Sequence, residues 1–251
     1  MRVFLTGASS GLGEALAQYY ATQGATLGLF ARRETELARL AAALGPASVA
    51  TYAGDVREPS DLARAAADFI ARHGLPDVVI ANAGISRGTL TEAPEDLPMF
   101  RAIFETNVLG MVHTFSPFVA PMREARAGVL VGIASVAGFR GLPGSGAYCG
   151  SKAAAITYLE SLRVELRGSG VSVVTVCPGF IATPMTKRNP YRMPFLTAPD
   201  DAARLVARAA ARRSAFYVLP WQMGVLGRVL RCAPRALYDR VVAGRARKPR
   251  Q

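Results

Sequence analysis

Tyr148 and Lys152 stand four positions apart in an alanine-rich stretch, a spacing that places two side chains on one face of a helix. A free phenol has a pKa of about 10, and lowering it by about three units requires roughly 4 kcal/mol in favour of the phenolate. An ammonium about 4 Å away, at an effective dielectric near 20, supplies that much. The pair is therefore predicted to act as a general acid or base, with the lysine making the phenol easier to ionise.

Ser135 is a third candidate for the same chemistry. It follows an apolar run over residues 128–134, which predicts a buried strand that ends at this serine. Its hydroxyl is expected to contact whichever oxygen Tyr148 serves. Tyr-x-x-x-Lys alone is common by chance, and a solvated helical pair is the alternative interpretation. Lysine occurs only at positions 152, 187 and 248, which favours a function for Lys152.

Composition limits the classes of protein that could carry these residues. The chain has 251 residues and is 51% hydrophobic, which predicts a single α/β domain with one substantial core. Its three cysteines, Cys149, Cys177 and Cys232, have unrelated spacings that give neither a disulfide framework nor a metal-ligand pattern. The chain contains no run of 18 apolar residues, so no membrane-spanning helix is predicted. No targeting segment is expected before the first strand. We expect a cytoplasmic protein without a metal.

A glycine-rich loop near the start predicts a binding site for an anion. A strand at residues 3–5 leads into Thr6-Gly7-Ala8-Ser9-Ser10-Gly11-Leu12-Gly13, and the apolar spacing of residues 14–20 predicts a helix. Glycines let a backbone approach a pyrophosphate, whose charge then meets the amides at the helix N-terminus. The glycines at 7, 11 and 13 therefore predict a dinucleotide loop, although such a loop alone is often a structural turn.

Two arginines follow the second predicted strand, residues 25–30. At this position an acidic residue accepts hydrogen bonds from an adenosine ribose, whereas arginine accommodates a 2′-phosphate. Arg32 and Arg33, with no Asp or Glu at positions 30–33, therefore predict NADP(H) in preference to NAD(H). Two solvated loop arginines are the alternative.

Two further strand ends contribute polar and small residues. Asp55 and Val56 follow a strand at 49–53, where an adenine ring would lie in a doubly wound sheet, although Asp55 could instead cap the next helix. Asn82, Ala83 and Gly84 follow a strand at 77–80. This small turn lets a ring or ribose come close, and the Asn82 amide can brace the neighbouring strands.

Asn107 lies among apolar residues within a predicted long helix over residues 99–122. Asparagine is unfavourable in the interior of a helix because its side chain competes for backbone hydrogen bonds. Our interpretation is that it holds a water molecule or distorts the helix toward the site. A buried asparagine bonded to a backbone carbonyl is the alternative.

The sixth predicted strand, residues 171–177, ends in Pro178-Gly179-Phe180-Ile181-Ala182-Thr183. This turn is predicted to cover a nicotinamide and offer it a hydroxyl, with a plain turn as the alternative. Residues 183–196 then contain three prolines and several large apolar side chains, which indicates a mobile apolar lid and a fairly apolar substrate.

Taken together, these motifs resemble the short-chain dehydrogenase/reductase family over about residues 1–220. The matching pieces, in family order, are TGASSGLG at 6–13, NAG at 82–84, Asn107, Ser135, YCGSK at 148–152 and PGFIAT at 178–183. The resemblance implies a single-domain Rossmann-type doubly wound parallel sheet of about seven strands with helices on both faces. It also implies hydride transfer between NADP(H) and a carbonyl or alcohol carbon.

The resemblance also assigns roles to residues. Tyr148 would be the general acid/base, Ser135 would hold the substrate oxygen, and Lys152 would bind the nicotinamide ribose. Asn107 would complete a water-linked proton relay. The cofactor would be held by Gly7, Ser9, Ser10, Gly11, Leu12, Gly13, Arg32, Arg33, Asp55, Val56, Asn82, Ala83, Gly84, Tyr148, Lys152, Pro178, Gly179, Ile181 and Thr183. A homodimer or homotetramer is implied through the helices over 99–122 and 148–167. A non-catalytic NADP(H)-binding sensor or scaffold of the same fold is the rival function.

The C-terminal extension, residues 221–251, is less typical of the family. The chain has a net charge of +12, and residues 228–251 carry eight basic residues against one acidic residue. Apolar stripes predict two short amphipathic helices, which could pack on the same domain as a pocket wall or form an oligomer contact. Alternatively, residues 222–251 could bind peripherally to the anionic inner face of a membrane. Nucleic acid is not expected, because no aromatic residues alternate with the basic ones.

Overall fold

The computed structural model describes residues 1–45, 48–187, 189–244 and 247–250. Seven parallel strands form one sheet in the order β3-β2-β1-β4-β5-β6-β7. The strands are β1 (Arg2–Thr6), β2 (Thr26–Ala31), β3 (Val49–Ala53), β4 (Val78–Ala81), β5 (Gly128–Ile133), β6 (Val171–Pro178) and β7 (Phe216–Leu219). The first six begin and end within about one residue of their predicted ranges, and the predicted doubly wound parallel sheet of about seven strands is confirmed.

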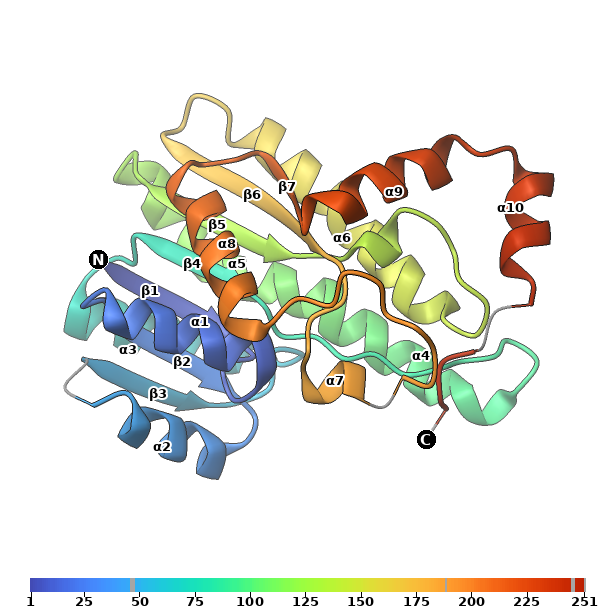
Figure 1. The fold of residues 1–251 in the computed structure, drawn as a ribbon. Helices are drawn as coiled ribbons and strands as arrows, with labels where there is room; N and C mark the ends of the chain where they lie inside the picture. The colour runs from blue at the N-terminus through green and yellow to red at the C-terminus, as the bar shows by residue number, and fades with distance from the viewer. Residues whose placement is uncertain (46–47, 188, 245–246, 251) are drawn as a thin grey trace.

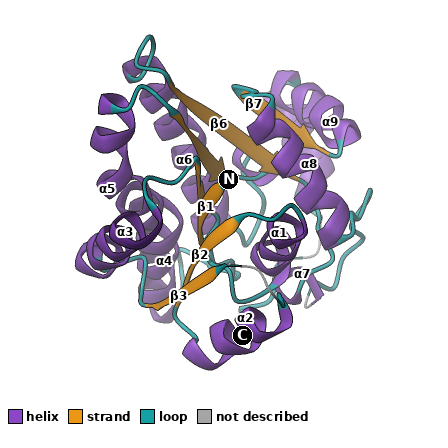
Figure 2. Ribbon diagram, turned by 90° about the vertical axis from the view of Figure 1, so that its left-hand side faces the viewer, coloured by secondary structure: helices purple, strands orange, loops and turns teal. Residues whose placement is uncertain are grey.

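Helices cover both faces of this sheet (Figure 2). They are α1 (Gly11–Thr22), α2 (Glu34–Ala43), α3 (Pro59–His73), α4 (Leu97–Phe104), α5 (Gly110–Glu124), α6 (Gly146–Glu165), α7 (Pro184–Lys187), α8 (Pro199–Ala211), α9 (Trp221–Cys232) and α10 (Arg235–Val242). Short turns of other helix types are η1 (Pro94–Asp96), η2 (Glu105–Leu109) and η3 (Val136–Gly138). Among the described residues, no helix has the length and apolar content needed to cross a membrane.

Two cores form because the strands are apolar on both faces. Alternate residues of a strand point to opposite sides, so Val3 and Leu5 of β1 pack with α1 and α8, whereas Phe4 packs with α3 and α5. Phe4, Phe69 and Phe118 are buried in the second core, and the Phe4 ring centroid lies 5.7 Å from that of Phe69 and 4.9 Å from that of Phe118. Burial on both sides explains why these strands are near-continuous apolar runs in the sequence.

The strand order places the ligand crevice. β1 lies between β2 and β4, so the chain turns to opposite sides of the sheet after β1 and after β4. In open parallel sheets the crevice outside the carboxyl ends of the strands, at this reversal, is where ligands bind. The loops after β1 to β6, which carry most of the predicted site residues, all emerge at this edge.

The predicted helix over residues 99–122 is interrupted. α4 ends at Phe104, the π-helical turn η2 follows, and α5 starts at Gly110. A π turn adds a residue to one helical turn and is frequently found at functional sites. Asn107 lies inside it, so the long helix expected over residues 99–122 is distorted at this asparagine, as our interpretation of Asn107 predicted.

The C-terminal residues run away from the sheet and then return. α9 and α10 extend from the end of β7, and residues 247–250 come back toward the start of α4 (Figure 1). Of the predicted lid and extension, residues 188, 245, 246 and 251 lie outside the described residues.

Candidate active site

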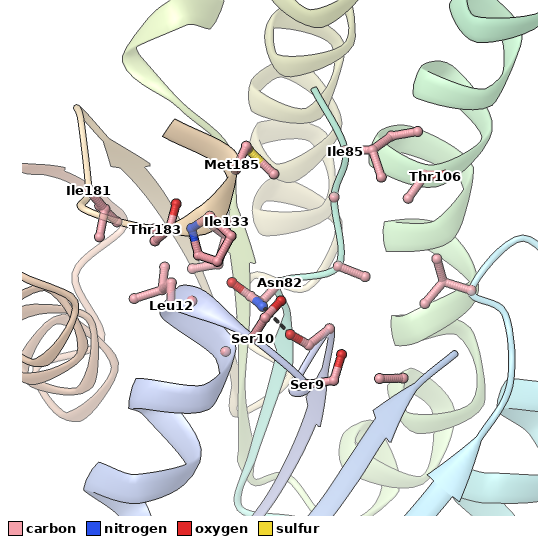
Figure 3. Close-up of a pocket in the computed structure, with 18 of the residues that line it drawn as sticks. Ser9, Ser10, Leu12, Asn82, Ile85, Thr106, Ile133, Ile181, Thr183 and Met185 are labelled. Carbon is pink, nitrogen blue, oxygen red and sulfur yellow. Dashed lines mark hydrogen bonds between the residues drawn. The ribbon is translucent and has the colours of Figure 1, made fainter. Parts of the chain in front are cut away.

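A cavity of about 460 Å³ runs along the carboxyl ends of the strands. Every residue that the sequence predicts to hold a dinucleotide lines it. These are Gly7, Ser9, Ser10, Gly11, Leu12, Gly13, Arg32, Arg33, Asp55, Val56, Asn82, Ala83, Gly84, Tyr148, Lys152, Pro178, Gly179, Ile181 and Thr183. Figure 3 shows Ser9, Ser10 and Leu12 at the start of α1, with Asn82 beside them and Ile181 and Thr183 across the cavity. Residues far apart in the sequence thus share one site.

The glycine loop is packed too closely for side chains. Gly7 has φ +68°, and a Cβ there would lie 2.7 Å from Cα of Ala83. A Cβ on Gly13 would lie 2.1 Å from the carbonyl oxygen of Gly7. The Asn82 amide donates to the carbonyls of Thr6 at 3.2 Å and Gly7 at 3.1 Å, so it braces β1 against β4 as predicted. The loop is therefore held tightly against the start of α1.

The start of α1 fits an anion. The helix begins at Gly11, directly after Ser10, and among the described residues no side-chain hydrogen bond caps this turn. Its first amides and the positive end of the helix dipole are left to whatever lies in the cavity. Together with glycines that only a bare backbone can occupy, this end of the cavity suits a pyrophosphate.

Arg33 and Arg32 lie beside the loop. Arg33 Nη2 donates to the Ser9 hydroxyl at 3.0 Å, and the Arg32 guanidinium lies 3.9 Å from a carboxylate oxygen of Asp55. Arg57 adds a third cation, donating to that same carboxylate at 2.7 and 2.9 Å. Burial raises the pKa of Asp55, but the hydrogen bonds from Arg57 outweigh it and hold the pKa below its usual value. This end of the cavity is therefore basic, with Asp55 ion-paired.

Ser135, Tyr148 and Lys152 meet deeper in the cavity. Ser135 follows β5, and its Oγ accepts a hydrogen bond from the Ala137 amide at 3.1 Å. Tyr148 and Lys152 lie in the first two turns of α6, and the Lys152 ammonium lies 6.0 Å from the centroid of the Tyr148 ring. Lys152 is 4% exposed and donates to the Ile133 carbonyl at 2.7 Å. The predicted cluster is thus assembled from two elements.

The acidities in this cluster differ from the prediction. Burial raises the pKa of Tyr148 to about 12, and a hydrogen bond with Ser135 acts in the opposite direction. Burial also lowers the pKa of Lys152 to about 8. The spacing of the two residues indicates only the attraction between them at a short distance, whereas the cost of removing each charge from water depends on how deeply each is buried. The expected fall in the phenol pKa was therefore wrong for the site as it stands.

Asn107 lies beside this cluster without reaching the cavity. Its Oδ1 accepts from the Ile85 amide at 2.8 Å, and its Nδ2 donates to the Ile85 carbonyl and to the Ser151 hydroxyl, each at 3.0 Å. It is 1% exposed. The alternative interpretation, a buried asparagine bonded to a backbone carbonyl, is thereby confirmed together with the helix distortion. Asn107 ties η2 to the loop after β4 and to α6.

A second cavity of about 560 Å³ adjoins the first. The two share residues at their junction, namely Ser135, Tyr148, Gly179, Met185 and Thr186. Its walls come from the predicted lid, from the loop before α6 and from α9, which contributes Met223, Leu226, Gly227 and Leu230. The inner side of α9 is therefore a pocket wall, whereas Val225 and Val229 on the same helix are exposed.

The structure adds site residues that sequence reasoning did not single out. Ile85, Thr106 and Ile133 line the first cavity, and Ile85 could have been found because it directly follows Asn82-Ala83-Gly84. His113 Nδ1 lies 2.9 Å from the carbonyl of Val56, so it supports a cavity-lining segment. Lys248 lines the second cavity, and nothing in its local sequence marks it. Among the described residues, no cluster of three or more His, Cys, Asp or Glu side chains could hold a metal ion.

Comparison with known proteins agrees with this geometry. The family model described as short chain dehydrogenase matches residues 1–193. A Myxococcus xanthus (strain DK1622) protein named as an uncharacterized oxidoreductase is 39% identical over 243 residues, which cover 94% of this chain and 93% of that protein. The 11-beta-hydroxysteroid dehydrogenase 1A of Arabidopsis thaliana is 37% identical over 188 residues, which cover 74% of this chain but only 53% of that relative.

A solved structure is also similar. The crystal structure titled ribose-5-phosphate isomerase from Brucella melitensis 16M superimposes with a TM-score of 0.78 at 28% identity, covering 86% of this chain and 89% of the other. Members of the matched family use a nicotinamide cofactor and small-molecule substrates, and the cavity along the strand ends has the residues to hold one. The chain belongs to the short-chain dehydrogenase family of oxidoreductases.

Proposed function

We propose that this enzyme transfers a hydride between NADP(H) and the carbonyl or alcohol carbon of a fairly apolar compound, with Tyr148 as the general acid/base. One observation carries the proposal: Ser135 and Tyr148 lie where the first cavity, along the strand ends, meets the second cavity. A substrate in the second cavity would reach both hydroxyls while facing the first. Bound NADPH would supply the hydride, and the protein places the groups.

Each polar group of the cluster would have its own role in binding or proton transfer. With a pKa of about 12, the Tyr148 phenol is protonated at neutral pH and can donate to a carbonyl oxygen. Ser135 offers the same oxygen a second hydroxyl contact. The Lys152 ammonium uses one N–H on the Ile133 carbonyl and keeps others for a ribose hydroxyl. Asn107 would position the neighbouring segment through Ile85.

The preference for a phosphorylated cofactor rests on charge. Arg32 and Arg33 lie at the end of β2, and no acidic residue occupies positions 30–33. A ribose 2′-phosphate carries up to two negative charges and would pair with these guanidiniums. Asp55 and Val56 would then lie near the adenine, whereas Ile181 and Thr183 would lie near the nicotinamide.

A non-catalytic nucleotide binder of the same fold remains the rival. Such a protein has no use for Ser135, Tyr148 and Lys152 together at the junction of two cavities. We therefore favour the enzyme, and one experiment separates the two. NADPH oxidation is measured against aldehydes, ketones and quinones, with Tyr148→Phe expected to lower turnover by at least a hundredfold. Tyr217→Phe, at a half-buried tyrosine that lines neither cavity, serves as the matched control.

The results would discriminate clearly. NADPH binding without turnover of any carbonyl would support the binder, and unchanged turnover in Tyr148→Phe would contradict the assigned acid. Replacing Arg32 and Arg33 together by serine should lower the preference for NADPH over NADH by at least tenfold, because each charged hydrogen bond to a phosphate contributes about 1.5–3 kcal/mol. An unchanged preference would remove the phosphate assignment.

We also propose a homodimer or homotetramer formed through α4, α5 and α6. Leu97, Leu109 and Val164 on this part of the surface are at least half exposed, and large apolar side chains that face water favour a protein contact. Sedimentation velocity of the wild type and of Leu109→Asp would test this. A monomer in both cases would exclude the proposed contact.

A further inference from the structure

The end of the chain is fastened across the segment that follows β4. The Gly88 amide donates to the Pro249 carbonyl at 2.8 Å. Arg250 donates to Asp96 and Glu95, each at 2.8 Å, and Asp96 is buried at the start of α4. A Cβ on Gly88 would lie 2.2 Å from the Lys248 carbonyl oxygen, so only a glycine lets the two backbones approach this closely. We name residues 247–250 the C-terminal strap.

The strap brings a second lysine to Tyr148. The Lys248 ammonium lies 5.1 Å from the centroid of the Tyr148 ring and donates to the Ser86 hydroxyl. Lys248 is half-buried and lines the second cavity. Within the described part of the chain, it makes no ion pair, because the strap's carboxylate contacts are made by Arg250. The ammonium is therefore available to a ligand.

The second cavity is basic as well as apolar. Its lining includes Arg140, Arg192 and Lys248 but, among the described residues, no Asp or Glu. Arg140 is already engaged, since it donates to two carbonyls of the α9–α10 junction and lies 4.1 Å over the Tyr238 ring. Arg192 is exposed on the lid. Lys248 is thus the cation that lies both within the cavity and next to the candidate acid.

The charge of Lys248 has an energetic consequence. Burial lowers the pKa of its ammonium to about 8, so the group is still mostly protonated at pH 7. A partly buried cation without a carboxylate partner has lost part of its hydration, and an anionic ligand that reaches it restores this loss. An apolar cavity with such a cation near the reacting hydroxyl suits a molecule with an apolar body and one negative group.

We propose that the preferred substrate is an apolar carbonyl or alcohol compound that carries a carboxylate close to its reacting carbon, and that Lys248 binds this carboxylate. The inference rests on the proposed function, because it names the substrate class of the same site. Lys248 is a specificity-determining residue that the strap delivers from 100 positions beyond Tyr148. A strap that only locks the structure would rely on Arg250 and the Pro249 carbonyl, and Lys248 would then be dispensable.

The test compares an aryl keto acid with its methyl ester. The wild type should have the higher kcat/KM for the acid, and Lys248→Met should lower it for the acid by at least tenfold through KM while changing the ester less than twofold. Lys248→Arg should retain most of the preference. Arg212→Met, at an exposed arginine after α8 that lines neither cavity, is the matched control and should change neither substrate.

Gly88→Ala is a second, independent variant. It leaves Lys248 in the sequence but forces the strap away from the loop, so the acid preference should fall as in Lys248→Met. A wild type that prefers the ester, or a Lys248→Met variant that loses acid and ester equally, would overturn the inference. A retained acid preference in Lys248→Met would do the same.

A binding measurement separates this inference from the proposed function. Calorimetry with NADP⁺ and an aryl carboxylic acid that lacks the keto group requires no turnover. At least tenfold weaker carboxylate binding in Lys248→Met supports the role of Lys248 even if no carbonyl is reduced, whereas equal binding in both proteins refutes it. Failure of the proposed function would instead appear as absent turnover of acid and ester alike.

Discussion

Replacing Lys152 by methionine should stabilise the fold while abolishing activity. Lys152 is almost fully buried, and its ammonium has the Ile133 carbonyl as a hydrogen-bond partner at 2.7 Å. Methionine has a similar length and no charge to desolvate. We therefore expect this lysine, proposed to take part in the reaction, to be held in place at a cost to the stability of the wild-type protein.

The size of the effect follows from the pKa of Lys152. A fall from 10.5 to about 8 corresponds to a penalty of about 3 kcal/mol for the charged amine in the folded state. Because the folded-state pKa is the lower one, this penalty is complete below pH 8, declines between pH 8 and 10.5, and vanishes above that range. Losing the hydrogen bond to Ile133 costs about 1 kcal/mol. Lys152→Met should therefore be about 2 kcal/mol more stable at pH 7.

Urea unfolding at several pH values measures this difference. At pH 9.5 the remaining penalty is about 1.4 kcal/mol, so the advantage of Lys152→Met should shrink almost to zero. Lys187→Met, at an exposed lysine, should show no pH-dependent difference from the wild type. A Lys152→Met protein that is less stable than the wild type at pH 7, or an advantage that does not decline with pH, would refute the burial argument.

Three further outcomes are expected. Gly13→Ala should abolish NADPH binding, as measured by the fluorescence of the nucleotide. It should also lower the free energy of unfolding by about 1–3 kcal/mol, because the added Cβ would lie 2.1 Å from the Gly7 carbonyl oxygen. Gly141→Ala, where a Cβ meets no atom within 4 Å, is its control, and equal binding in both would contradict the fit. Asn107→Ala should lower the free energy of unfolding by about 2–4 kcal/mol, since it leaves the Ile85 amide and carbonyl unpaired; unchanged urea midpoints would show that water replaces the side chain. If the exposed apolar side chains of α9 and α10 contact a membrane, the protein should co-sediment with anionic vesicles and Val229→Asp should weaken this, whereas equal recovery with and without vesicles would exclude such a contact.

The sheet and the nucleotide end of the site were predictable because their signals are local. A strand buried on both faces is a continuous apolar run, and a loop that must approach an anion needs glycines at particular positions. Gly7 and Gly13 therefore indicate the loop by residue type alone, and Arg32 and Arg33 indicate the charge at the end of β2 in the same way. The order of the motifs along the chain follows the order of strand ends along one edge of the sheet.

The missed features depend on desolvation and on contacts between distant segments. The interval between Tyr148 and Lys152 gives their common face but not how deeply each is buried, and burial reversed the expected direction of the phenol pKa. Asn107 marked an irregular helix, but its partner Ile85 is 22 positions away.

The parallel α/β sheet, the glycine loop and the residues that could transfer a proton can all be inferred from residue type and short-range spacing. Three other properties follow from the folded chain alone: which of these residues share a cavity, what their acidities are and that Lys248 lies beside Tyr148. Hydration and proximity depend on how the whole chain packs, and Lys248 reaches the site only because Gly88 and Asp96 hold the strap there.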